Sequence, residues 1–215
     1  MNEVKPMRLR IFFHKNEAMR FTGHLDLHKT WERIFRRAGL PLAYSQGFHP
    51  QPRLNLACAL PLGFTSQGEV LDAWLEASLL LENVQAELAK SAPPGITIDK
   101  IDEMDLKVPA LQTQVYSSEY EITFLTPVPE LDQKLDEILA AKSLPRQRRD
   151  RSYDLKPLIE DLQRLPDTEE GFGRILTRLA AREGATGRPE ELIDALGLIP
   201  SQARVHRTRL FFAEL

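Results

Sequence analysis

Residues 53–77, RLNLACALPLGFTSQGEVLDAWLEA, contain two runs in which apolar and other side chains alternate. Residues 53–60 and 69–77 each have the period of a half-buried β-strand. The Gly63–Gly68 segment between them predicts a turn. This part of the chain therefore predicts two neighbouring antiparallel strands with one apolar side each.

The flanking segments extend this pair into a longer order of elements. Residues 7–14 alternate as a strand, and residues 24–38 have an amphipathic helical pattern that ends at Gly39. Residues 81–90 predict a second helix, and residues 96–101 a closing strand. The order is β-α-β-β-α-β, which is that of a ferredoxin-like unit with a four-stranded sheet and two helices on one face.

The pattern restarts in the second half of the chain. Residues 155–168 show no clear periodicity. The other expected elements are strands at 116–125, 148–154, 172–180 and 205–212, and helices at 130–141 and 189–196. The sequence thus predicts an α+β protein of two tandem ferredoxin-like units, residues 1–106 and 116–215, joined by a linker at 107–115.

The composition excludes several classes of protein. A single cysteine, Cys58, excludes internal disulfides and an iron–sulfur or thiolate zinc site held by this chain alone. It also fits a reducing, cytoplasmic location. No segment has the length and apolarity of a membrane span, and the N-terminus lacks an apolar signal region. We expect no cofactor and no membrane association.

Charge is distributed unevenly along the chain. The formal net charge is -3, yet the first 53 residues carry ten basic and four acidic side chains, a surplus of six positive charges. A weakly acidic protein can therefore still present a strongly positive face.

Arginines and aromatic rings coincide at this positive end. On the sheet face opposite the helices, strand alternation predicts Arg8, Arg10, Phe12, Arg53 and Trp74. Arginine pairs with phosphate and rings stack on bases, so this face, with Arg33, Arg36 and Arg37 of the first helix, predicts binding of single-stranded RNA. In the alternative interpretation the second unit covers the face. Phe12 and Trp74 would then be interface core, and the arginines would pair with acids such as Asp72.

The segment from Tyr44 to Arg53 predicts a stiff binding loop. Gly47 and two prolines restrict its backbone, and polar side chains crowd onto it: Ser45, Gln46, His49 and Arg53. A rigid loop loses little entropy on binding. The alternative is a connector that supports the sheet edge, with Phe48 in the core.

Two histidines, His24 and His28, are spaced four residues apart on the first helix, as metal-ligating pairs are. A third ligand would have to be His49 or Asp26, and no complete metal signature is present, so we expect no metal. Histidine acid/base chemistry is an alternative, for which no catalytic residue can be assigned.

Three motifs carry a resemblance to a known family. They are FTGHLDL at residues 21–27, ERIFRRAGLPLAYSQGFHPQPRL at 32–54 and ALPLGFTSQGE at 59–69. They resemble the radical SAM-linked protein family, a bacterial domain family of unknown function. Val70 departs from the aromatic residue that members often have there. The family's characteristic positions correspond here to His24, Asp26, Ser45, Gln46, Gly47, His49, Pro50 and Arg53.

The resemblance implies a partner rather than a reaction. Members are encoded beside, or fused to, a radical SAM protein, often near ribonuclease and ribosomal-protein genes. A radical SAM enzyme holds its cluster with three cysteines, and this chain has one. We therefore expect a non-catalytic accessory protein of a radical SAM enzyme that binds RNA, including ribosome-associated RNA. Two alternatives stay open: a metal-independent ribonuclease, by analogy with tandem ferredoxin-like CRISPR enzymes, and a module that only docks on the partner.

Overall fold

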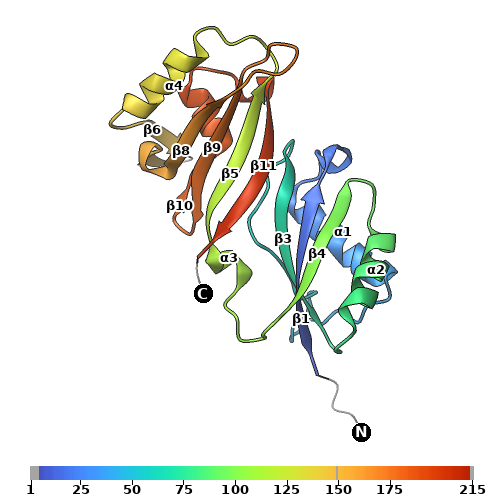
Figure 1. Cartoon of the computed structure of the whole chain (residues 1–215). Coiled ribbons are helices and arrows are strands. Elements are labelled where there is room, and N and C mark those ends of the chain that lie inside the picture. Colours follow the sequence, from blue (N-terminus) through green and yellow to red (C-terminus); the bar gives the residue numbers. More distant parts are fainter. Residues whose placement is uncertain (1–4, 149, 214–215) are drawn as a thin grey trace. The chain divides into compact units, whose positions relative to one another are not determined.

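The computed structural model describes residues 5–148 and 150–213, and it combines α-helices with antiparallel β-sheet (Figure 1). The chain splits into two compact units between Gln114 and Val115. Within the described residues, every helix is too short or too polar to cross a membrane.

The first unit contains the four strands and two helices that the sequence predicts. Its sheet order is β2-β3-β1-β4, with all neighbouring strands antiparallel. The elements are β1 (Met7–Lys15), η1 (Glu17–Met19), α1 (His24–Arg37), β2 (Leu54–Leu56), β3 (Thr65–Leu75), α2 (Leu81–Ser91), β4 (Ile96–Met104) and α3 (Leu111–Gln114).

Strand β2 is shorter than the predicted strand at residues 53–60. The Ala57 N–H still donates to the Val70 carbonyl at 2.9 Å, but the next residues leave β3. The Gly63 N–H donates to the Arg20 carbonyl at 3.0 Å, which draws this segment toward η1. Strand β3 consequently starts at Thr65, inside the predicted turn.

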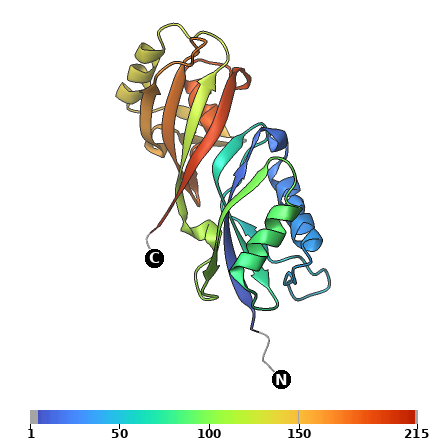
Figure 2. The ribbon, with the colours of Figure 1, turned by 45° about the vertical axis from the view of Figure 1, so that its right-hand side comes forward.

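The core of the first unit lies between its sheet and the helices α1 and α2, which cover the same sheet face (Figures 1 and 2). Trp31 of α1 packs edge-on against Phe13 of β1, with ring centroids 4.8 Å apart. The predicted apolar rows of β1 and β3 and the buried residues of α1 belong to one cluster: Met7, Leu9, Ile11, Phe13, Leu71, Ala73, Leu75, Leu27, Trp31, Ile34 and Phe35. Helical and strand periodicity therefore predicted the inward faces of β1, β3 and α1 correctly.

The second unit has the same strand order. Strand β9 pairs with β8 and β5, and β5 pairs with β11, which gives β8-β9-β5-β11. The elements are β5 (Val115–Phe124), α4 (Leu131–Ala140), β6 (Pro145–Arg148), β7 (Arg151–Asp154), η2 (Lys156–Leu158), β8 (Ile159–Leu165), β9 (Arg174–Arg182), β10 (Ala185–Thr186), α5 (Pro189–Ala195), η3 (Pro200–Gln202) and β11 (Ala203–Phe212). Strands β6 and β7 form a separate hairpin. Strand β8 lies in the segment where the sequence shows no pattern.

The segment predicted as a linker, residues 107–115, contains the short helix α3. Its carbonyl groups at Val108 and Pro109 accept hydrogen bonds from Arg8 of β1. Residues 107–114 are thus fixed to the first unit.

Candidate functional site

Arg8 and Arg10 lie in the interior, although the sequence predicts them on an open, phosphate-binding face. Arg8 is 1% exposed and Arg10 is 8% exposed. Both donate to the Asp72 carboxylate, Arg8 through Nη2 at 2.6 Å and Arg10 through Nε at 2.8 Å. Arg8 also donates to the Pro109 carbonyl at 2.8 Å, and Arg10 to Gln114 Oε1 at 3.3 Å. The pairing with Asp72 agrees with the alternative interpretation, and it leaves neither guanidinium accessible to RNA.

Trp74 is buried as well and offers no open ring face. The Cζ atoms of Arg8 and Arg53 lie 4.9 and 4.8 Å from its ring centroid. Arg53 itself is exposed. Phe12 is half-buried, and the Lys100 ammonium lies 5.4 Å from its ring centroid. The sheet residues thus form a structural cluster rather than the predicted stacking surface, with Arg53 at its margin.

Helix α1 presents the accessible positive charge of the first unit. Its exposed side chains Lys29, Arg33, Arg36 and Arg37 make up what we call the basic face. Arg37 donates through Nη2 to the Ser91 carbonyl at the end of α2. For the other three side chains, the described part of the chain contains no hydrogen-bond or ion-pair partner. The predicted phosphate contacts Arg33, Arg36 and Arg37 therefore share one solvent-facing surface.

A pocket of about 430 Å³ opens beside the basic face. Thr30, Arg33 and Arg37 are spaced three and four residues apart, so they lie on one side of α1. The lining residues are Met19, Thr30, Arg33, Arg36, Arg37 and Pro93. Sequence reasoning missed Met19, Thr30 and Pro93. Helical spacing was a signal for Thr30, whereas the other two come from η1 and from the segment before β4, which only the fold brings to α1.

The two histidines of α1 have different surroundings. His28 Nε2 lies 3.1 Å from the Leu54 carbonyl oxygen, on the side of α1 that faces β2. His24 is the first residue of the helix and is half-buried, while Asp26 is exposed in the first turn. The described residues contain no group of three His, Cys, Asp or Glu side chains placed to hold a metal ion.

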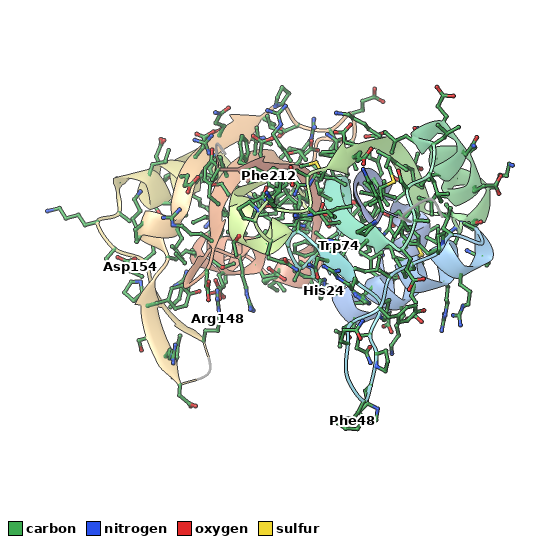
Figure 3. All side chains as sticks on the ribbon, turned by 90° about the horizontal axis from the view of Figure 1, so that it is seen from below. His24, Phe48, Trp74, Arg148, Asp154 and Phe212 are labelled. Atoms are coloured by element: carbon green, nitrogen blue, oxygen red, sulfur yellow. The ribbon has the colours of Figure 1, made fainter. Side chains whose placement is uncertain are left out.

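Residues 44–53 form the loop that we call the tip loop. Tyr44 pairs with Pro52 as an isolated bridge, and the Gln51 N–H donates to Ser45 Oγ at 2.9 Å. Ser45, Gln46 and His49 are exposed, as a binding loop requires. Phe48 is fully exposed, which contradicts the alternative of a core position. Figure 3 shows Phe48 at the end of this loop, away from Trp74 and His24 of the same unit.

The second unit contains an ordered ion-pair cluster between its hairpin and α5. Arg148 donates to both carboxylate oxygens of Glu191, at 2.9 and 2.7 Å, and to Tyr153 Oη at 3.1 Å. The hydrogen bond that Arg148 donates to Glu191 is the main reason that the pKa of Arg148 is raised. Burial raises the pKa of Tyr153. The adjacent Glu190 has a buried Oε2 atom without a hydrogen-bond partner among the described residues.

Replacing Glu190 with glutamine is expected to raise the melting temperature at pH 7 and to leave it unchanged at pH 4. Burial raises the pKa of Glu190 above its ordinary value of 4.5, so the folded chain binds this proton more tightly than the unfolded chain. The stability that the proton contributes is complete below the unfolded value and is lost as pH rises through the folded value. Thermal denaturation measures the melting temperature at pH 7 and at pH 4, and Glu183→Gln, at an exposed position, is the control. A lower melting temperature for Glu190→Gln than for the wild type at pH 7 would contradict this assignment.

Most of the chain matches one known protein family. Residues 8–189 match a family described as an uncharacterized protein conserved in bacteria (DUF2344). The chain belongs to this family. The matched range includes the basic face and the tip loop, together with most of the second unit. No curated protein matches the chain.

Solved structures show only a distant likeness. A crystal structure of a Cbf5–Nop10–Gar1 complex is 14% identical, with a TM-score of 0.46, over 86% of this chain and 45% of the other. A structure of an H/ACA RNP bound to a substrate RNA containing 2′-deoxyuridine is 13% identical, with a TM-score of 0.42, over 86% and 43%. An archaeal box H/ACA sRNP Nop10–Cbf5 complex is 11% identical, with a TM-score of 0.41, over 97% and 58%. This chain spans less than two thirds of each matched chain, and TM-scores below 0.5 support no functional conclusion.

Proposed function

We propose that this protein is a non-catalytic recognition protein that binds RNA through the basic face of α1. The observation that carries the proposal is the exposure of four cationic side chains on one helix face, three of which line a single pocket. Arginine guanidinium groups match phosphate oxygens in geometry as well as charge. Exposed cations without carboxylate partners retain their full attraction for a polyanion, in contrast to Arg8 and Arg10.

The tip loop supplies a second element of this proposal. An exposed phenylalanine ring contributes little to the stability of the fold, but it is well suited to stack on an unpaired base. The loop is stiffened by Pro50, Pro52 and the hydrogen bond between Gln51 and Ser45, so little entropy is lost when it binds. We infer that Phe48 contacts a base while the exposed polar groups at Ser45, Gln46, His49 and Arg53 position the target strand.

A titration of single-stranded RNA by filter binding tests the function. Phosphate contacts release counterions, so affinity is expected to fall by about tenfold or more between 50 and 200 mM salt if several arginines contact phosphate. Affinity that stays constant over this range would contradict binding through the basic face.

We further propose a radical SAM protein as the partner, on the basis of the family resemblance and the single cysteine. Exposed apolar side chains near the start of α1 support a docking surface there, namely Phe21, Leu25 and Leu62. The Gly63–Arg20 hydrogen bond brings the segments of Leu62 and Phe21 together. Such clustered apolar exposure is typical of protein contact sites.

Replacing Leu25 with serine is expected to lower co-purification with the proposed radical SAM partner by about fivefold or more, because a buried leucine contributes about 1.5–3 kcal/mol. Leu80→Ser is the matched control, since Leu80 is 74% exposed and Leu25 is 75% exposed. Quantitative pull-down from cells measures both variants. Equal recovery with the two variants would remove this surface from the proposal.

We also propose that both units are ferredoxin-like. The first unit has the strand order β2-β3-β1-β4, and the second has β8-β9-β5-β11. Strands β5, β8, β9 and β11 are the first, second, third and fourth main strands of the second unit along the chain, so both units have the order second-third-first-fourth. In each, a helix follows the first and the third of these strands. This shared order supports a tandem arrangement in which the β6–β7 hairpin is an insertion.

A further inference from the structure

The pocket beside α1 has a wall that is fixed by backbone contacts. The Asn16 N–H donates to the Gly95 carbonyl oxygen at 2.8 Å, which ties the start of η1 to the turn before β4. Gly95 has a positive φ of 93°, and a Cβ atom there would lie 2.6 Å from Met19 Cγ. Met19 is thus held tightly against this turn, close to Pro93. The apolar side of the pocket is already in place before any ligand binds.

The opposite side of the pocket is cationic. Arg33 is three residues from Arg36 and four from Arg37, so like charges are neighbours on the helix surface, which is mildly unfavourable. Among the residues that the structure describes, the lining contains no acidic side chain. Arg37 is oriented by its hydrogen bond to Ser91, which positions one guanidinium in advance. An anion in the pocket would relieve this repulsion and accept several charge-assisted hydrogen bonds.

The cationic and apolar sides of the pocket together indicate which class of anion it binds. A phosphate monoester carries close to two negative charges and three acceptor oxygens, which suits three arginines better than the single charge of an internal phosphodiester. Met19 and Pro93 then lie beside the group to which the phosphate is attached. A thioether and a proline ring are apolar surfaces that suit a nucleobase or sugar. The volume of about 430 Å³ falls in the range of small-molecule sites.

We propose that this pocket binds a nucleoside monophosphate group, with the phosphate on Arg33, Arg36 and Arg37 and the nucleoside against Met19 and Pro93. Two sources carry this group, a free nucleotide and the phosphorylated end of an RNA. The proposal rests on the proposed function, which it narrows from an RNA-binding helix to a site for a terminal phosphate.

Calorimetric titration of the full chain with adenosine monophosphate, adenosine and inorganic phosphate tests the pocket. Adenosine monophosphate is expected to bind more tightly than phosphate, and adenosine not to bind measurably. Arg33→Gln and Arg36→Gln should each weaken adenosine monophosphate by about tenfold, the effect of one lost charge-assisted contact. Lys107→Gln removes the same charge from an exposed position of the same unit, outside both the pocket lining and the basic face, so it should change the Kd by less than about twofold. Met19→Ala should weaken adenosine monophosphate but not phosphate.

Two outcomes overturn the pocket proposal: no binding of adenosine monophosphate, or equal weakening by Arg33→Gln and Lys107→Gln. Thermal denaturation of each variant verifies that the fold is retained. Because Arg33→Gln and Arg36→Gln are independent variants, the test remains valid if one of them does not fold. The arginines and Lys107 are exposed, so little change in stability is expected for their variants.

Short RNAs identify the source of the group. An RNA decamer with a 5′- or 3′-phosphate that binds more tightly than a decamer with hydroxyls at both ends supports an RNA end. Equal affinity of all decamers, together with binding of adenosine monophosphate, supports a free nucleotide. If decamers bind equally and adenosine monophosphate does not bind, the pocket proposal fails while RNA binding stands. If adenosine monophosphate binds and no decamer does, the pocket stands while the proposed function fails.

Discussion

Replacing Asp72 with alanine is expected to destabilise the first unit by about 3–5 kcal/mol, because two buried guanidinium groups lose their counter-charge. Arg8 and Arg10 together donate four hydrogen bonds to the Asp72 carboxylate, at 2.6 to 3.0 Å. Neither arginine can turn to solvent without losing its contacts to residues 109 and 114. Urea denaturation followed by tryptophan fluorescence reports this unit, since both tryptophans of the chain belong to it.

A matched control for Asp72→Ala is Asp99→Ala. Asp99 also pairs with a β1 side chain, His14 Nε2 at 2.8 Å, but its carboxylate is 51% exposed. Asp99→Ala is therefore expected to lower the free energy of unfolding by less than about 1 kcal/mol. A combined Arg8→Met, Arg10→Met and Asp72→Leu variant should regain most of the lost stability, because a buried ion cluster is often replaceable by apolar side chains. Equal destabilisation by Asp72→Ala and Asp99→Ala would contradict the structural role of the cluster.

Neutralising the basic face is expected to lower RNA affinity by about a hundredfold or more at low salt. The variant carries glutamine at positions 29, 33, 36 and 37, where each cation is proposed to contact a phosphate. The slope of log affinity against log salt should fall by about 0.7 for each lost contact to single-stranded RNA, which is close to three in total. Glutamine is a good helix former, so α1 should persist, with a small loss from the C-terminal helix dipole. Filter binding at several salt concentrations measures both quantities.

The control for this variant removes four other exposed cations and so the same total charge: Lys107, Lys142, Arg151 and Arg188, each replaced by glutamine. Nonspecific attraction to the whole protein predicts equal losses in the two variants. Binding at the basic face predicts a change of less than about threefold in the control. Equal loss in both would place the contact elsewhere.

The inward faces of the first unit were predictable because helical and strand periodicity are local properties. Leu27, Trp31, Ile34 and Phe35 are buried in α1 as their spacing predicts, and the arginines on the other side of the helix are exposed. The tip loop was predictable for a similar reason. Pro50 and Pro52 restrict the backbone, and Gly47 has a φ of 130°, a conformation that favours glycine.

The role of Arg8 and Arg10 was not predictable from the same patterns. Alternation placed them correctly opposite the helices, but it contains no information on what covers that side of the sheet. Their environment depends on the carbonyl groups near Pro109 and on Asp72 of β3, far away in sequence. Strand β8 was missed because its pairing with β9 shifts register between Ile159 and Asp161, which disrupts alternation.

Crosslinking the protein to RNA in cells, followed by mass spectrometry of the attached peptides, tests the central claim most directly. RNA binding through the basic face and the tip loop predicts nucleotides attached to peptides from residues 29–53. Attachment confined to residues 115–213, or no RNA above background, would contradict it.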